Sequence, residues 1–180
     1  MVGARVGSVV DELVDARRTE PAFVLEERSM LEAWLEYQRT TLLLKCEGLS
    51  DEQLKRRPVA TSLLSLHGLV RHMAEVERNW FRRALLTDGS APWIWFDPEI
   101  DDSELVPLDD ADWDADLDAW SSECAASRRA AAAHGLDDTG VRDGKPCSLR
   151  WIYVHMIEEY ARHNGHADFI RELIDGAVGY

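Results

Sequence analysis

The longest helical pattern in the chain lies at residues 148–176, which read SLRWIYVHMIEEYARHNGHADFIRELIDG. Ser148 can cap the start of this segment, because a serine hydroxyl accepts hydrogen bonds from the free N–H groups of a first helical turn. Gly176 can end it, since glycine tolerates the left-handed conformation that often follows a helix. With about 100° per residue, the aliphatic side chains gather on one face. The spacing therefore predicts one long amphipathic helix over residues 148–176.

Polar side chains occupy the middle of this apolar face. Glu159, set at zero on the helical wheel, is flanked by His163 at about +40° and His166 at about −20°. Ile152 and Ile170 share the stripe at about +20°. Three polar groups that face a core need compensation, because an isolated buried carboxylate costs several kcal/mol. A bound metal ion is one way to provide it, and the i, i+4 spacing of Glu159 and His163 places their side chains one turn apart on the same face.

A third ligand must come from another helix. His72 is the best candidate, because it lies at the edge of the apolar face of a second predicted helix, residues 62–86. His67 is a weaker one, since it projects about 140° away from His72. Two histidines and one carboxylate leave coordination positions open, which is typical of catalytic sites for zinc, iron, nickel or manganese. The sequence predicts a site of His72, Glu159 and His163, with a structural polar network as the alternative.

The remaining segments complete a helical architecture. Apolar spacing predicts further long helices over residues 27–48 and 112–134, and Ser50 can cap a short turn after the first of them. No alternating period-two segment and no Asn-Gly hairpin signal is found. We expect an all-α fold, a four-helix bundle formed by residues 25–180. The preceding residues, 1–24, are interpreted as an N-terminal arm with a short helix at residues 6–18.

The second and third long helices are joined by a proline-rich and tryptophan-rich stretch, residues 87–111. It contains the sequence APWIWFDPEIDDSELVPLDD. A crossover loop of this length is uncommon in a small domain without a role of its own. We expect Trp93, Trp95 and Phe96 to anchor the loop on the bundle, with a lid over a site as the alternative.

The overall composition limits the possible partners. The 180 residues include 20 Lys and Arg and 34 Asp and Glu, so the formal charge is −14, and phosphate backbones and anionic lipid surfaces would be repelled. A membrane-spanning helix needs about 18 consecutive apolar residues, and the sequence contains no such run. Cys46, Cys124 and Cys147 form no CxxC motif, and the charged residues near the start disfavour an export signal. We expect a cytoplasmic protein with reduced thiols and a small-molecule substrate, without nucleic acid or membrane as partner.

Two segments resemble a known family. Residues 68–83, GLVRHMAEVERNWFRR, and residues 148–176 are similar to the DinB-like, or YfiT-like, superfamily of four-helix metalloenzyme-type proteins, in particular to its actinobacterial branch. The resemblance covers most of the chain from about Val24 onward, with both motifs in order. In that superfamily, one histidine of the second helix and a His-x-x-x-His pair on the last long helix hold the metal. The matching positions are His72, Glu159 and His163.

Glu159 departs from the family pattern, because it stands where the first histidine of the pair is expected. The related metal-binding domain of mycothiol-dependent maleylpyruvate isomerases resembles this chain in having a carboxylate there, so the departure is compatible with a metal. His166 falls in the run that follows the pair. It is interpreted as a residue of the catalytic site that orients a ligand or bound water, acts as a general base, or serves as a fourth ligand.

The resemblance implies a divalent-metal-dependent transferase or hydrolase. Such enzymes often use a low-molecular-weight thiol, mycothiol or bacillithiol, as cosubstrate for a small electrophile. Superfamily members often form homodimers, so a homodimer is expected here too. Two other interpretations stay open: a non-catalytic, dimeric metal-binding or ligand-binding bundle, and a bundle whose His/Glu cluster is a hydrogen-bonded network without metal.

Overall fold

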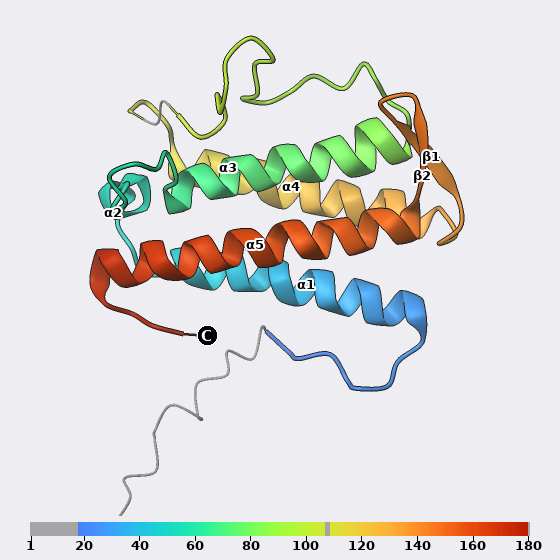
Figure 1. Cartoon of the computed structure of the whole chain (residues 1–180), viewed down its shortest axis with the longest axis horizontal. Helices are drawn as coiled ribbons and strands as arrows, with labels where there is room; N and C mark the ends of the chain where they lie inside the picture. The colour runs from blue at the N-terminus through green and yellow to red at the C-terminus, as the bar shows by residue number, and fades with distance from the viewer. Residues whose placement is uncertain (1–17, 107–108, 180) are drawn as a thin grey trace, which may run out of the picture.

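Four long helices lie side by side in the computed structural model, which describes residues 18–106 and 109–179 (Figure 1). The elements follow the order α1 (Glu27–Cys46), α2 (Asp51–Lys55), α3 (Leu66–Glu77), the π-helix η2 (Arg78–Leu85), α4 (Trp113–Ala132), β1 (Thr139–Arg142), β2 (Lys145–Ser148) and α5 (Leu149–Asp175). α1 packs chiefly on α5, and α3 packs chiefly on α4. The predicted all-α class is confirmed. The short helix predicted at residues 6–18 falls, apart from Arg18, outside the described residues.

The ends of α5 match their prediction. The Ser148 hydroxyl accepts a hydrogen bond from the backbone N–H of Trp151, and Gly176 closes the helix with φ 80°. The predicted start of the second long helix is wrong. Ser65 is the N-cap of α3, with its Oγ 3.0 Å from the Gly68 nitrogen that donates to it. Ser62 forms a local turn instead, in which its hydroxyl accepts from the N–H of Leu64.

A β-hairpin lies between α4 and α5, where none was expected. β1 and β2 pair antiparallel, and Asp143 and Gly144 form the turn with φ 50° and 74°. Asp-Gly is a favoured dipeptide for such turns, because both residues must adopt positive φ. The hairpin packs against η2 so closely that a Cβ at Gly140 would lie 2.1 Å from the carbonyl oxygen of Ala84. Only glycine fits this approach.

The crossover loop is anchored on the bundle by a buried carboxylate. Glu75 of α3 accepts hydrogen bonds from three successive backbone N–H groups of the loop, those of Ile94, Trp95 and Phe96. Arginine side chains of α3 and η2 stack on the indole rings of Trp95 and Trp93. The expected anchoring role of the loop is confirmed. Its alternative role as a lid stays a prediction.

The centre of the bundle is a polar network around Glu77. Arg39 of α1 donates to both Glu77 carboxylate oxygens at 2.7 Å, and both side chains are buried. From α5, the Tyr160 hydroxyl donates to Glu77 at 2.9 Å, and from α4 the indole N–H of Trp120 donates to the Tyr160 oxygen at 3.0 Å. Cys124, which is also buried, lies 3.6 Å from the same carboxylate. Each of the four long helices thus contributes to one network.

Among the described residues, no helix is both long and apolar enough to cross a bilayer. Cys46 is buried and Cys147 is partly buried. The first of these findings agrees with the sequence, in which charged residues interrupt the long apolar stretches.

Replacement of Glu77 by alanine should destabilise the protein by about 3–5 kcal/mol, because it leaves the Arg39 guanidinium buried without its partner. Urea unfolding followed by circular dichroism measures the change. Glu172→Ala, which removes an exposed carboxylate of α5, is the matched control and should stay within about 0.5 kcal/mol of the parent. The double variant Arg39→Met, Glu77→Leu should be more stable than Glu77→Ala, since it removes both charges. A Glu77→Ala protein as stable as the control would contradict the central role of the network.

Candidate metal centre

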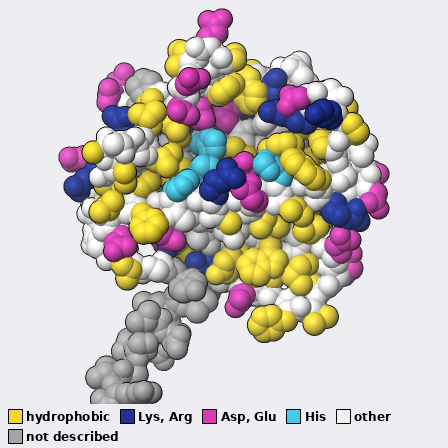
Figure 2. Space-filling view, viewed as in Figure 1, with side chains coloured by type: hydrophobic (Ala, Val, Ile, Leu, Met, Phe, Trp, Pro, Cys, Tyr) yellow, Lys and Arg dark blue, Asp and Glu magenta, His cyan; other side chains and the backbone are white. Residues whose placement is uncertain are grey.

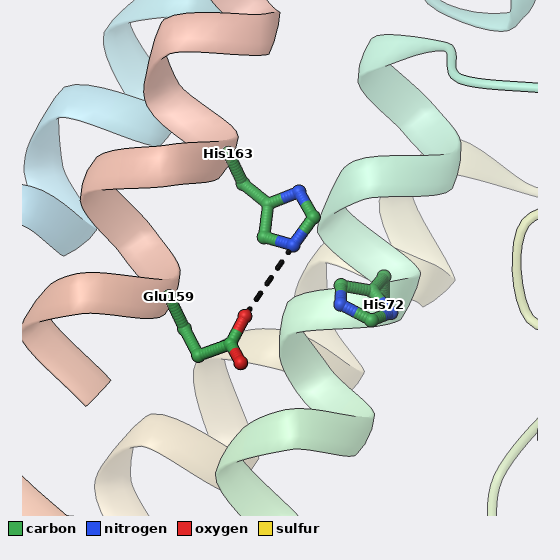
Figure 3. A group of neighbouring side chains, drawn as sticks. All are labelled: His72, Glu159 and His163. Atoms are coloured by element: carbon green, nitrogen blue, oxygen red, sulfur yellow. Dashed lines mark ion pairs between the residues drawn. The ribbon is translucent and has the colours of Figure 1, made fainter. Parts of the chain in front are cut away.

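The structure brings together the three residues that the sequence predicts as ligands. His72 comes from α3, and Glu159 and His163 come from α5, with one ligand atom of each residue within 4.8 Å of the others. Figure 3 shows Glu159 and His163 pointing from α5 toward α3. The Nε2 atom of His163 lies 3.5 Å from Glu159 Oε2, and the rings of His72 and His163 are 4.7 Å apart between centroids.

The position of the cluster on α5 differs from the expected one. The buried side chains of this helix centre on Met156, Tyr160 and Ala167, at about 60° to 100° from Glu159 on the wheel. Glu159 and His163 therefore lie at the edge of the buried face rather than in its middle, and His166 is exposed. The reason is that α5 packs chiefly on α1, which turns the Tyr160 side inward and leaves the Glu159 side along the seam with α3. An edge position keeps the cluster accessible.

Further contacts orient both histidine rings. His72 Nδ1 lies 2.9 Å from the Oε1 atom of Glu104, a buried residue of the crossover loop. His163 Nδ1 lies 3.4 Å from Nδ1 of His166. When His72 and His163 each carry their ring hydrogen on Nδ1, the lone pairs of their Nε2 atoms are available to a metal ion. A carboxylate behind a histidine is the usual way in which proteins hold a metal-binding ring in one tautomer.

The electrostatics of the cluster favour neutral imidazole at His163. Burial lowers the pKa of His163 to about 3, and the nearby His72, His166 and Arg162 side chains add to the shift. The hydrogen bond from His72 lowers the pKa of Glu104, which keeps that carboxyl group ionised. A neutral ring beside a carboxylate can bind a cation without first losing a proton.

A cleft of about 770 Å³ opens over the cluster. Figure 2 shows histidine side chains gathered near the middle of this face of the bundle, with acidic and basic side chains beside them. His166 and Arg162 line the α5 side of the cleft, and Trp80 and Arg142 line its hairpin end. The volume is in the range of small-molecule sites.

A second group of possible ligands overlaps the first. His155, Glu158 and Glu159 also offer ligand atoms within 4.8 Å of one another, and His155 Nε2 lies 3.4 Å from Glu159 Oε1. Glu159 is thus shared by two clusters. His155 was not among the predicted ligands, although the spacing of four between His155, Glu159 and His163 was a usable signal.

The other residues singled out from the sequence have separate positions. His67 is fully buried on another face of α3, with its Nε2 2.7 Å from Asp116 Oδ2, as its wheel position indicated. His166 contacts His163 and lies at the cleft surface, and its catalytic role stays a prediction. Glu104 was missed, because no helical spacing relates a residue of a long loop to His72.

Four long helices with candidate ligands on the second and on the last of them are the arrangement of the DinB-like, or YfiT-like, class of metalloenzyme-type proteins, and here a glutamate replaces one histidine of the usual set. Within this class, the family model for mycothiol-S-transferases matches residues 30–176, and the chain belongs to that family. No curated protein matches the chain. The resemblance found in the two sequence motifs is confirmed.

His163 should make the metal-free protein less stable as the pH falls. Its folded-state pKa of about 3 lies below the ordinary value of 6.5, so the unfolded chain binds the extra proton first and stability is lost below pH 6.5. By about pH 5 the loss is at most about 2 kcal/mol, and partial exposure of the ring reduces it. Urea unfolding at several pH values should show a shallower pH dependence in His163→Gln than in the parent. His134→Gln, remote from the cluster, serves as the control, and equal slopes in His163→Gln and the parent would contradict the prediction.

Proposed function

We propose that the protein is a divalent-metal-dependent S-transferase that joins the thiol of mycothiol to a small electrophile. His72, Glu159 and His163 would hold the metal. The observation that supports the proposal is the convergence of these donors from two helices within 4.8 Å at the floor of a cleft. The choice of mycothiol as the thiol rests on the family match, because the family is described as mycothiol-S-transferase.

The donor set fits a catalytic divalent cation. Three protein ligands of mixed nitrogen and oxygen type leave coordination positions for further ligands, unlike the closed four-cysteine sites that serve structure. Zinc, nickel, iron and manganese are all compatible with two imidazoles and one carboxylate. A bound ion would act as a Lewis acid that lowers the pKa of a thiol or water and so makes a nucleophile near neutral pH.

The surrounding residues have separate tasks in this proposal. Glu104 holds the His72 ring in one orientation. His166, exposed at the cleft surface, accepts the thiol proton as a general base. The sulfur then forms a bond to the electrophilic carbon, and the leaving group departs with the electron pair of the bond that breaks.

A homodimer and a cytoplasmic location stay predictions.

Metal content tests the proposal and separates the two clusters that share Glu159. Protein purified without a nickel column should contain about one divalent ion per chain by elemental mass spectrometry. His72→Ala and His163→Ala should lose the ion, whereas His155→Ala and Glu158→Ala should keep it. The reverse pattern would assign the ion to the second cluster. A folded parent that binds none of the four metals on titration would contradict the proposal and favour a structural polar network.

The loaded parent should also consume mycothiol in the presence of electrophiles such as monochlorobimane, with His163→Ala inactive. A loaded parent that stays inactive across a panel of thiols and electrophiles would favour the non-catalytic binding bundle instead.

Replacement of Glu104 by glutamine should weaken metal binding by about 10- to 100-fold, because the neutral amide holds the His72 ring less firmly and adds less to its basicity. Competition with a chromophoric chelator measures the affinity. Asp101→Asn changes an exposed carboxylate of the same loop and is the matched control. Equal affinities in the Glu104 variant and the parent would show that the contact with His72 does not tune the site.

A further inference from the structure

A second hollow adjoins the cleft at its hairpin end. It measures about 630 Å³ and lies between the β1–β2 hairpin and the first turn of α5. Its walls combine the rings of Trp80 and Trp151 with charged and hydroxyl groups of Arg142, Asp143, Lys145 and Ser148. Nothing in the proposed metal chemistry uses these residues.

The aromatic wall of this hollow is open to solvent. Trp151 is 49% exposed, although an indole ring is usually buried when it serves only as core. The Trp151 ring stacks on the His155 ring at 4.9 Å between centroids, and the centroid of the Trp80 ring lies 5.1 Å from that of Trp151. The three rings form a continuous aromatic surface that leads from the hollow toward Glu159, which lies 3.4 Å from His155.

The charged side chains around this surface are two cations, Arg142 and Lys145, and one anion, Asp143. Arg142 is already engaged: it donates to the Asn79 side chain at 2.6 Å, lies over the Trp80 ring, and is 3.3 Å from Asp143. An anion would therefore find few uncompensated positive charges here. A neutral polyhydroxylated ligand fits better, because its hydroxyl groups can bond to both acidic and basic side chains while its C–H groups pack on the electron-rich face of an indole.

The hollow is also rigidly built. The hairpin is fixed on η2 by the close approach of Gly140 to Ala84 and by the bond between Arg142 and Asn79. Trp80 and Arg142 line both the hollow and the cleft over the metal ligands. A ligand seated in the hollow can therefore extend along this shared wall to the His72, Glu159 and His163 cluster. Preformed walls of this kind reduce the entropy lost on binding.

We propose that the hollow bounded by the hairpin, Trp80 and Trp151 binds the sugar portion of the thiol cosubstrate. This inference rests on the proposed function, since mycothiol carries its thiol on an acetylated cysteine joined to a glucosamine–inositol pseudodisaccharide. The sugar rings lie against Trp151 and Trp80, and the cysteine follows the wall past His155 to the metal ligands. The same hollow then distinguishes mycothiol from simple thiols that lack a sugar.

Binding of the sugar alone to metal-free protein tests this assignment. The probe is N-acetylglucosaminyl-inositol, which is uncharged and contains neither cysteine nor thiol, and binding is followed by isothermal titration calorimetry and by tryptophan fluorescence. The parent should bind it saturably in the millimolar range. Trp151→Ala should weaken binding by at least about tenfold, which equals about 1.4 kcal/mol. Phe169→Ala, which removes another exposed aromatic ring of α5, is the matched control and should bind like the parent.

Two outcomes would overturn the assignment: a parent that does not bind the probe, and a folded Trp151→Ala protein that binds it as well as the parent does. Neither depends on a metal or on turnover. A parent protein that binds the sugar probe but no divalent metal would contradict the proposed function alone. A parent protein that binds the metal but not the sugar probe would contradict the sugar site alone.

Discussion

The buried ion pair between Arg39 and Glu77 holds the bundle in the arrangement on which the site depends. Glu77 receives Arg39 from α1 and Tyr160 from α5, and Trp120 of α4 donates to Tyr160. Burial, together with Cys124 and Glu77, raises the pKa of Tyr160 well above its ordinary value, so its hydroxyl stays a donor. Since Tyr160 directly follows Glu159, and Glu77 lies on the helix of His72, this network also sets the register between the helices that carry the cluster.

Two segments outside the long helices, the crossover loop and the β1–β2 hairpin, add further groups around the candidate ligands. The crossover loop brings Glu104 to His72, and Glu75 holds that loop by three backbone N–H groups. The hairpin brings Arg142 to the other end of the cleft and is locked on η2 through Gly140. Functional groups on loops are useful when a rigid scaffold fixes the loops. Here, helices supply the three candidate ligands, and the loop and hairpin supply the groups that orient and surround them.

The edge position of the cluster combines burial with access, and a catalytic metal centre would need both. Burial is sufficient to keep His163 neutral, as its lowered pKa shows. Exposure is sufficient for a cleft to reach the same residues. A cluster in the middle of the apolar face, which the wheel suggested, would have been closed to any substrate. The family to which the chain belongs is described as mycothiol-S-transferase, and an accessible seam between two helices is compatible with that description.

The sequence alone predicts the long helices, the two caps of α5 and the pairing of Glu159 with His163, because helical periodicity and capping are local properties within a few residues. It also indicated His72, since that residue lies on an apolar edge of its own helix. Three contacts become visible only in the folded chain: Glu104 meets His72, Glu77 joins four helices, and Gly140 allows the hairpin to pack on η2. These contacts join residues far apart in the chain. Their formation depends on how the helices rotate and pack against one another, which no local spacing records.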